Sequence, residues 1–455
     1  MSSRRMSRRA FLAKTAAAGA SLTLIGLGVQ CGATPAPTPT PVVKAEATKA
    51  KPTGEPLIIW MSDDWSGQAD KFVAYTKYAQ ECGEAIGIPV DYRPVDWTTL
   101  GQQQPIIMAS DKYVVDVLDL GANEIADYGR QGKLVALDDY LPADMLDKWL
   151  QGPLNTGKVG GKLYGLCVWP SWVIGFYNKE LYEKAGLDPA KPPKTLGELE
   201  EHCKALLKVT SSAYLDTWTD WHWQRVFRQL VYAKDGKLWE GGTAEDPDTI
   251  KYTLVIPEAK EALSWMKHMY QDKLLDPDSV TLTQQDIAEK FQRGETAITF
   301  NWEGFAAIME KPEESQVVGK VGAFGFPGDE PGKGVAQTGF EYMTIPTIAR
   351  NIEGAAKWIE CINKPSIIKA RALDQFFNPV YTEMYDDPEI KKKLYYWEVI
   401  KEIEGRSLAR NYHPSNGEVM DFLVVKIQDV VLGQADPDAV LDEMQKFAEE
   451  KAKAA

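Results

Sequence analysis

Aromatic and acidic side chains gather in one short stretch of the sequence, where Trp218, Asp220, Trp221 and Trp223 follow one another closely. Over its 455 residues the chain has 14 Trp and 19 Tyr, and such rings bury large areas while offering flat faces to ligands. Ring faces stack on apolar C–H surfaces, and carboxylate, amide and guanidinium groups hydrogen-bond to hydroxyl groups. These residue types indicate non-covalent binding of a small polar molecule with apolar faces.

Common motifs of catalysis and metal binding are missing from the sequence. It has no His-Glu-x-x-His, Gly-x-Ser-x-Gly or Gly-x-Gly-x-x-Gly, and its four histidines have no ligand spacing. The run from Gly152 to Lys158 resembles a phosphate-binding loop, but Val159 replaces the metal-binding hydroxyl. We therefore expect no enzyme, no cofactor and no metal. A glycoside hydrolase stays open as an alternative, because its two carboxylates are defined by a spatial separation of about 5 to 10 Å.

Composition places the chain among soluble globular proteins of two or three domains. Hydrophobic residues make up 44% and charged residues 25%, so a sizeable core can form. The net charge is −14, and it falls to −19 without the five bases of residues 1–30. An acidic body repels phosphate backbones, so we expect no nucleic-acid partner.

The first 30 residues have the pattern of an export signal. Five bases and no acid precede the uncharged apolar stretch 15–29, which is shorter than the roughly 20 residues that span a bilayer. The run from Ser7 to Lys14, with paired Arg8 and Arg9, resembles the twin-arginine export pattern. A chance basic tail is the alternative.

Cys31 follows this signal and resembles the acylated cysteine of bacterial lipoproteins. Residues 31–56 are rich in Pro, Thr, Ala and Lys, a composition that stays extended without a packed core. We predict a lipid anchor at Cys31 and a tether over residues 31–56. A leader without an anchor is the alternative.

The four other cysteines are Cys82, Cys167, Cys203 and Cys361, and their spacing is not that of a metal site. Outside the cell they can pair as disulfides in three complete ways, or they can remain buried free thiols. The sequence does not choose between these states.

Strands and helices alternate at the start of the body. Residues 57–61, 88–92 and 114–118 are apolar runs that predict strands, with helical stretches between them. This order indicates α/β units on a mostly parallel sheet, where ligands bind beyond the carboxyl ends of the strands. The loops 62–67 and 120–124 are therefore candidate binding loops.

Sequence motifs from residue 160 onward point to one family. Gly161-Lys162-Leu163-Tyr164-Gly165 precedes an apolar strand, Tyr177-Asn178-Lys179 and a Glu-Lys-Ala-Gly-Leu run follow, and Pro192-Pro193-Lys194-Thr195 opens a helix. Further segments fit at 291–302, 325–328, 339–346, 355–359 and 432–434. Together these motifs resemble the family 1 extracellular solute-binding proteins, relatives of maltose-binding protein that serve ABC importers.

The resemblance implies an α/β protein with the two-lobed, type II periplasmic-binding-protein fold. Its chain would cross between the lobes three times, near residues 168–173, 300–304 and 339–343. Lobe 1 would comprise residues 57–170 and 303–340, and lobe 2 residues 171–302 and 341–455. Closure of such lobes around a ligand is a known mode of hinge motion.

The predicted ligand contacts lie on loops and crossings that the resemblance places around the cleft. They are Asp63, Asp64, Trp65, Asn123, Glu124, Trp172, Trp218, Asp220, Trp221, Trp302, Glu303, Glu341, Tyr342, Phe377, Arg410 and Tyr412. Helix capping, turn chemistry and core packing are the alternative roles of these residues. Of the rings at 218–223, one or two must belong to the core, because helical residues two apart face different ways.

The predicted function is that of the extracytoplasmic substrate-binding component of an ABC transporter. It would bind a mono- or oligosaccharide between its lobes, deliver it to the permease subunits, and act as a monomer tethered to the outer face of the cell membrane. A binding protein for a non-sugar solute such as a polyamine is the first alternative, and a secreted glycoside hydrolase is the second.

Overall fold

The computed structural model describes residues 54–62, 73–95 and 97–454, which belong to one compact unit. The export signal, Cys31, most of the tether and the predicted contacts Asp63, Asp64 and Trp65 lie outside the described residues. Among the helices that are described, none is long and apolar enough to cross a membrane.

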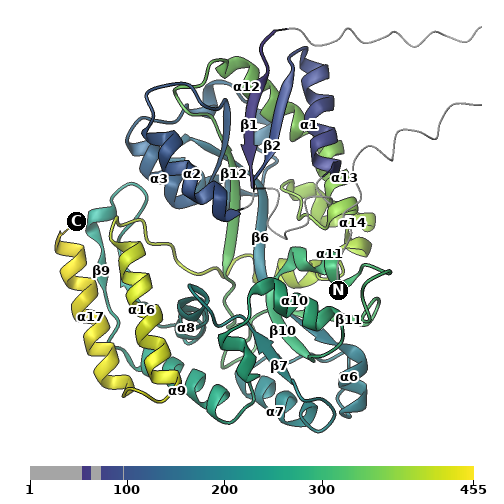
Figure 1. Cartoon of the computed structure of the whole chain (residues 1–455), viewed down its shortest axis with the longest axis vertical. Helices are drawn as coiled ribbons and strands as arrows, with labels where there is room; N and C mark the ends of the chain where they lie inside the picture. The colour runs from purple at the N-terminus through teal and green to yellow at the C-terminus, as the bar shows by residue number, and fades with distance from the viewer. Residues whose placement is uncertain (1–53, 63–72, 96, 455) are drawn as a thin grey trace, which may run out of the picture. The chain divides into compact units, whose positions relative to one another are not determined.

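The described part of the chain alternates strands and helices (Figure 1). The strands are β1 (Leu57–Met61), β2 (Val90–Pro94), β3 (Val117–Leu120), β4 (Lys158–Val159), β5 (Lys162–Leu163), β6 (Gly165–Asn178), β7 (Tyr214–Asp216), β8 (Trp239–Glu240), β9 (Lys251–Tyr252), β10 (Ile298–Trp302), β11 (Val321–Phe324) and β12 (Thr338–Thr344). The helices are α1 (Val73–Ile86), α2 (Trp97–Ala109), α3 (Ala122–Arg130), α4 (Ala143–Leu146), α5 (Gln151–Thr156), α6 (Lys179–Lys184), α7 (Leu196–Leu206), α8 (His222–Ala233), α9 (Pro257–Gln271), α10 (Gln284–Gln292), α11 (Ala306–Met309), α12 (Ile352–Ile362), α13 (Pro365–Gln375), α14 (Pro388–Lys393), α15 (Trp397–Ile403), α16 (Asn416–Val431) and α17 (Pro437–Ala454).

Polar side chains cap several of these helices. The Asn178 side chain accepts hydrogen bonds from two backbone amides at the start of α6, and Thr195 does the same for one amide of α7. Thr283 and Asp286 form a capping box at α10. Each cap satisfies amides that have no partner inside the helix, and this fixes where the helix begins.

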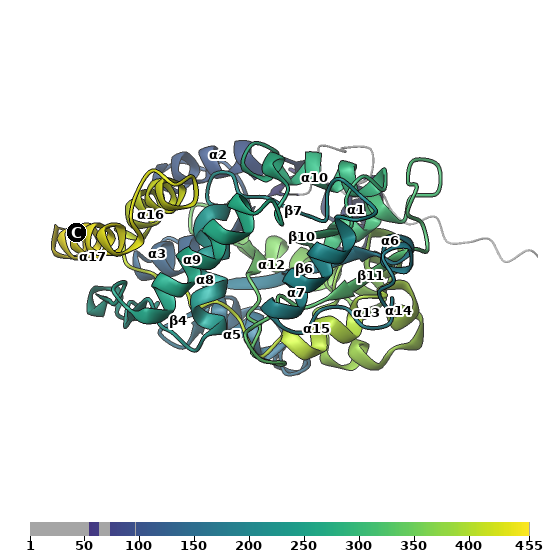
Figure 2. The ribbon, with the colours of Figure 1, turned by 90° about the horizontal axis from the view of Figure 1, so that it is seen from below.

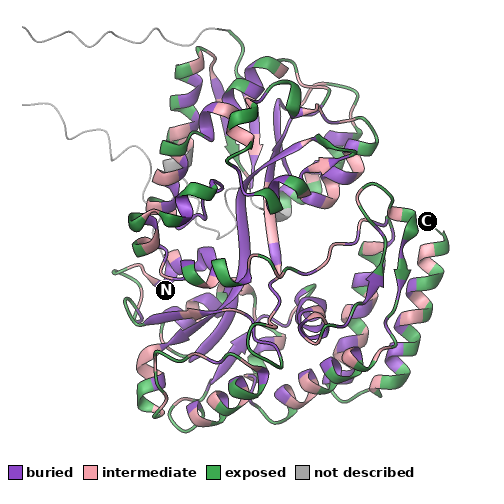
Figure 3. Cartoon of the chain, turned by 180° about the vertical axis from the view of Figure 1, so that it is seen from behind, coloured by how far each residue is buried: buried purple, intermediate pink, exposed green. Residues whose placement is uncertain are grey.

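The strand β6 joins two lobes. The sheet order is β2-β1-β3-β12-β6-β10-β7, and β11 also pairs with β6. Residues 165–172 of β6 pair with β12, whereas residues 173–178 pair with β10 and β11. All fourteen residues of β6 are buried (Figure 3). The first predicted crossing, 168–173, therefore coincides with the point where β6 changes its pairing partners.

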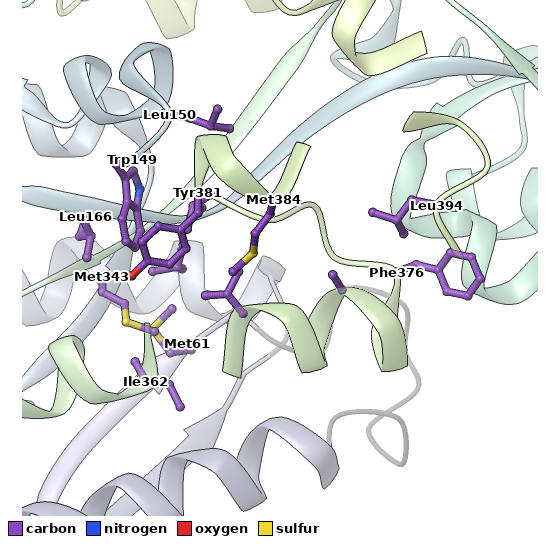
Figure 4. Packing of buried hydrophobic residues seen from close by; sticks show 14 of the residues in the cluster. Met61, Trp149, Leu150, Leu166, Met343, Ile362, Phe376, Tyr381, Met384 and Leu394 are labelled. Carbon is purple, nitrogen blue, oxygen red and sulfur yellow. The ribbon is translucent and has the colours of Figure 1, made fainter. Parts of the chain in front are cut away.

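Lobe 1 is built from β1–β3, β12 and the first half of β6, with β1 parallel to β2 and β3. Its core contains Trp149, whose ring contacts Tyr381 edge-on with 4.9 Å between centroids. Met61 and Met343 lie beside this pair (Figure 4). The segment after α13 thus packs into the core of lobe 1.

Lobe 2 is built from the second half of β6 with β7, β10 and β11. The helices α8, α9 and α16 pack against one another, and α17 packs on α16 and α9 (Figures 1 and 2). Their core contains Trp218 and Trp223, whose ring centroids are 5.6 Å apart.

Parts of the predicted lobe bounds disagree with the observed contacts. The prediction places residues 341–455 in lobe 2, but β12 pairs with β3 and α12 packs on α1. It places residues 303–340 in lobe 1, but β11 pairs with the lobe 2 half of β6. The third crossing therefore runs between β11 and β12, ahead of the predicted 339–343. An apolar run in a sequence shows that a strand exists, not which strand it pairs with.

One pair of cysteines forms a disulfide. Cys82 on α1 is bonded to Cys361 on α12, and both helices belong to lobe 1. Cys167 and Cys203 are buried free thiols. This resolves the alternatives that the sequence leaves open.

Candidate functional site

A cavity of about 710 Å³ lies between the two lobes. It is lined from lobe 1 by α5, Trp172 and β12, from lobe 2 by the loop 241–245, and by the segment 404–412 that precedes α16. Its lining residues are Gly152, Pro153, Asn155, Thr156, Lys158, Trp172, Gly241, Thr243, Ala244, Glu245, Thr338, Phe340, Glu404, Gly405, Ser407, Leu408, Arg410 and Tyr412. We call this the interlobe cavity, and its volume suits a small-molecule ligand.

Aromatic rings form one wall of the interlobe cavity. Thr338 on β12 lies opposite Trp172 on β6 in the antiparallel pair. Phe340, two residues further on, points to the same face as Thr338 because side chains alternate along a strand. The Trp172 and Phe340 rings meet edge-on at 6.2 Å, and the Arg410 guanidinium lies 5.3 Å from the Phe340 ring centroid. Trp172 is only 1% exposed and supports the wall from the core, so the half-buried Phe340 supplies its ring surface and Arg410 its cationic group.

Some polar atoms at this wall lack a hydrogen-bond partner among the described residues. They include Nε1 of Trp172 and Nη2 of Arg410, both of which are buried. A buried donor without a partner costs free energy, so a ligand that accepts these hydrogen bonds is stabilised. Tyr412 is held in place by its backbone amide, which donates to the Gly242 carbonyl at 2.9 Å.

On the other side of the sheet, Asp119 of β3 and Glu341 of β12 form a carboxyl pair. Asp119 accepts hydrogen bonds from the amide and the hydroxyl of Ser62, and Glu341 Oε2 lies 3.5 Å from the same hydroxyl. Burial raises the pKa of Asp119 to about 6, while the Ser62 hydrogen bonds oppose the shift. Burial raises the pKa of Glu341 well above its ordinary value, and the negative charge of Asp119 raises it further. The pair therefore favours holding a proton near neutral pH.

Glu303 forms hydrogen bonds that link the end of β10 to β6 and to the segment after α13. It follows β10, is fully buried, and accepts hydrogen bonds from the Ser171 hydroxyl, the Trp172 amide and the Asn378 side chain at 2.7–2.9 Å. Burial raises the pKa of Glu303 to about 8, although these donors favour the charged form. Glu303 is a structural tie between β6, the end of β10 and the segment after α13, and it does not line the interlobe cavity.

The family of this chain follows from its match to a known protein-family model. The family model of the bacterial extracellular solute-binding proteins matches residues 65–367. The chain belongs to this family.

Two bacterial binding proteins are similar to this chain over most of their length. A Brucella abortus (strain 2308) binding protein is 23% identical over 389 residues, which cover 83% of this chain and 89% of that protein. A Deinococcus radiodurans protein named "Probable ABC transporter-binding protein" is 24% identical and covers 68% of this chain and 72% of its own length.

Solved structures share the fold. Maltose-bound T. maritima MalE3 superposes with a TM-score of 0.75 at 19% identity, covering 87% of this chain and 99% of that one. A ribitol-bound solute-binding protein from Agrobacterium radiobacter K84 gives 0.73 at 22% identity, covering 88% and 100%. These matches confirm the predicted two-lobed α/β fold. The family comprises extracellular binding proteins, so the protein's place of action is outside the cytoplasm.

Three of the predicted contacts line the interlobe cavity. They are Trp172, Arg410 and Tyr412. Glu124 lies in the first turn of α3, close enough to Arg410 for the positive charge to lower its pKa, although burial, the larger effect, raises it. Asn123 is its neighbour in the same turn.

Other predicted contacts do not reach the interlobe cavity. Trp218 and Tyr342 are fully buried, with Trp218 Nε1 donating to Asp216 and the Tyr342 hydroxyl donating to the Pro153 carbonyl. In this structure neither offers a face to a ligand. Phe377 packs on Trp169 with 4.3 Å between ring centroids, and its neighbour Phe376 is also buried.

The remaining predicted rings and acids are not among the lining residues of the cavity. Asp220 is exposed with a φ of 44°, and Trp221 is 39% exposed and stacks on His222. Trp302 is half-buried and faces Gly339, on the face of β12 opposite Phe340. Their role in binding stays a prediction, as does that of Glu341.

Phe340 and Lys158 are cavity residues that the sequence analysis missed. The sequence does carry a signal for Phe340. Glu341 and Tyr342 are both predicted contacts, but neighbouring residues in a strand face opposite sides, so Phe340 shares a face with Tyr342 and not with Glu341. Lys158 is the last residue of the rejected phosphate-loop match, and only the tertiary fold brings it to the cavity.

Proposed function

We propose that this chain is the substrate-binding subunit of an ABC importer and that it binds a carbohydrate in the interlobe cavity. The observation that carries the proposal is the wall of Trp172, Phe340 and Arg410 between two lobes joined by three crossings. Ring faces suit the C–H faces of a sugar, and the cationic and hydroxyl groups around them suit its hydroxyls. The structural relatives described above have maltose and ribitol bound, which supports this ligand class.

The ligand would act by favouring a closed arrangement of the lobes. A ligand shifts a conformational equilibrium only by its difference in affinity for the two states. A sugar that touches Phe340 of lobe 1 and the loop 241–245 of lobe 2 has more contacts when the lobes are closed. The permease would then recognise the closed, loaded form, with the binding protein acting as a monomer.

Replacing Phe340 by Ala is expected to weaken binding of the cognate sugar about tenfold to a hundredfold. This corresponds to the loss of one stacked ring, roughly 1–3 kcal/mol. The sugar is first identified by native mass spectrometry of freshly purified protein, and affinities are then measured by calorimetry. Tyr140→Ala is the matched control, because Tyr140 is an exposed lobe 1 ring outside the cavity lining. Equal affinities of the Phe340 variant and the wild type would contradict this site.

A polyamine is the second candidate ligand. Asp119 of β3 and Glu341 of β12 place two carboxyl groups beside the Ser62 hydroxyl, and an amine could replace the proton that they favour. Spermidine therefore belongs in the same titrations, and binding of spermidine without sugar would favour this candidate. Incubation with oligosaccharides is expected to give no cleavage products, since the family consists of binding proteins.

We also propose that twin-arginine export and acylation of Cys31 tether the protein to the membrane. The support is the sequence pattern of residues 1–56. A Cys31→Ala variant should leave the membrane fraction and appear in the soluble extracytoplasmic fraction. Wild-type protein that is soluble and unacylated by mass spectrometry would refute the anchor.

A further inference from the structure

Two neighbouring arginines at the interlobe cavity have no ion-pair partner among the described residues. They are Arg410, which lines the cavity, and Arg228 on α8. The Nη2 atom of Arg228 donates to the carbonyl of Ala409, so its guanidinium lies next to the chain segment that carries Arg410. The two charges are close enough that Arg410 lowers the pKa of Arg228, which burial, as the main cause, brings to about 10. Both groups remain cationic at neutral pH.

The partners of Arg228 are all neutral. Its Nη1 donates to the Gln224 side chain at 3.1 Å, its Nη2 to the backbone of Ala409 at 2.8 Å, and its guanidinium carbon lies 5.1 Å from the Trp239 ring centroid. A ring face and amide oxygens orient a guanidinium but do not neutralise it. Arg228 therefore adds uncompensated positive charge behind Arg410.

The Glu124 carboxylate feels the charge of Arg410 but lies at the start of its own helix. A Cβ placed on Gly121 would lie 2.6 Å from Oε2 of Glu124, which shows that this carboxylate folds back on the start of its own helix α3. A helix N-terminus stabilises a carboxylate there. Glu124 thus senses the charge of Arg410 without forming an ion pair with it.

One nitrogen of the Arg410 guanidinium is left without a hydrogen-bond acceptor among the described residues. This atom, Nη2, is buried, while the planar group packs on Phe340 at 5.3 Å. The cavity also holds Lys158, whose Nζ donates to the Asn155 side chain at 3.1 Å. Two acidic residues line the cavity, the exposed Glu245 and the half-buried Glu404. Neither forms an ion pair with Arg410. Guanidinium groups bind carboxylate and phosphate oxygens more strongly than neutral hydroxyls.

We infer that the sugar taken up in the interlobe cavity carries an anionic group, a carboxylate or a phosphate, and that Arg410 is the residue that selects it. The inference rests on the proposed function and narrows its substrate class from carbohydrates in general to acidic ones. Arg228 acts as a positioning residue, because it anchors the backbone beside Arg410 and makes the local potential more positive.

Calorimetric titration with matched sugars tests the inference. The probes are D-glucose with D-glucuronate and D-glucose 6-phosphate, D-galactose with D-galacturonate, and any ligand that native mass spectrometry finds on the protein. The acidic member of at least one set should bind about tenfold to a hundredfold more tightly than its neutral counterpart. The carboxylate and phosphate arms distinguish the two sources of negative charge.

Variants then assign the preference to Arg410. In Arg410→Gln, affinity for the acidic sugar should fall to that for the neutral one, while affinity for the neutral sugar changes less than about threefold. Arg406→Gln is the control on the same segment, because Arg406 does not line the cavity, and it should keep the preference. If Arg410→Gln fails to fold, wild-type titrations at rising salt serve instead, since screening should weaken binding of the acidic sugar only.

The outcomes separate this inference from the proposed function. Neutral sugars that bind as tightly as acidic ones, or a preference that survives in Arg410→Gln, would overturn the inference and leave sugar binding intact. If no sugar binds and the co-purified ligand is not a carbohydrate, the proposed function and the inference both fall.

Discussion

The Asp216→Ala variant is expected to unfold at a much lower denaturant concentration than the wild type. Asp216 and Arg225 form an ion pair of 2.7 Å, with side-chain exposures of 0% and 1%, in the core of lobe 2. Removing the carboxylate leaves a charged guanidinium in a place that water does not reach. Breaking a buried pair from one side costs about 3–5 kcal/mol, because the remaining charge is uncompensated.

The environment of Asp216 adds to this cost. Its carboxylate also accepts hydrogen bonds from the hydroxyl of Tyr214 at 3.0 Å and from Nε1 of Trp218 at 3.3 Å. Arg225 in turn donates to Gln229, whose side chain donates to the Val335 carbonyl between β11 and β12. The network therefore connects the end of β7 to α8 and to the third crossing.

An exposed ion pair provides the control. Lys260 and Asp438 approach to 2.6 Å but are 51% and 63% exposed. Asp438→Ala should cost no more than about 1 kcal/mol, because solvent screens such a pair. Denaturation followed by tryptophan fluorescence compares the two variants. Equal midpoints for Asp216→Ala and Asp438→Ala would show that the buried pair does not stabilise lobe 2.

Loss of the Cys82–Cys361 disulfide is expected to destabilise the protein by about 2–5 kcal/mol. The bond joins α1 to α12 across 279 positions of sequence, and a cross-link over a long loop restricts the unfolded chain strongly. The measurement is the denaturation midpoint of lobe 1 with and without a thiol reductant. The variant with both Cys82→Ser and Cys361→Ser should match the reduced wild type.

The same variant also controls for side effects of the reductant. Its midpoint should not change on reduction, since Cys167 and Cys203 are free thiols. Alkylation of the unreduced, unfolded wild type should leave Cys82 and Cys361 unmodified. Finding both of them alkylated would mean that the protein does not contain this disulfide.

The local strand pattern was predictable, and its pairing was not. The run 57–61 has the bounds of β1, but the strands expected at 88–92 and 114–118 lie at 90–94 and 117–120. The apolar run shows where a chain is buried. The extent of β2 is set by its pairing with β1, and that of β3 by its pairing with β1 and β12. The same limit explains why the prediction assigns α12 and the last four residues of β12 to lobe 2.

The site was predictable in part. Crossing residues supply Trp172, and the polar segment before α16 supplies Arg410 and Tyr412. Residue type alone does not tell which of Phe340 and Tyr342 lines the cavity, because both rings point to the same side of β12. In the structure Tyr342 is fully buried, and its hydroxyl donates to the Pro153 carbonyl. Trp218 is a predicted ligand contact, but in the structure its indole nitrogen donates a hydrogen bond to the buried Asp216 carboxylate.

Carbohydrate binding in the interlobe cavity is best tested by a crystal structure of the protein with the ligand that native mass spectrometry identifies. We expect a sugar between the Trp172–Phe340 wall of lobe 1 and the loop 241–245 of lobe 2, with Arg410 donating a hydrogen bond to it. A ligand that is not a carbohydrate, or a sugar bound only on the opposite face of β12 beside Trp302 and Glu341, would contradict this expectation.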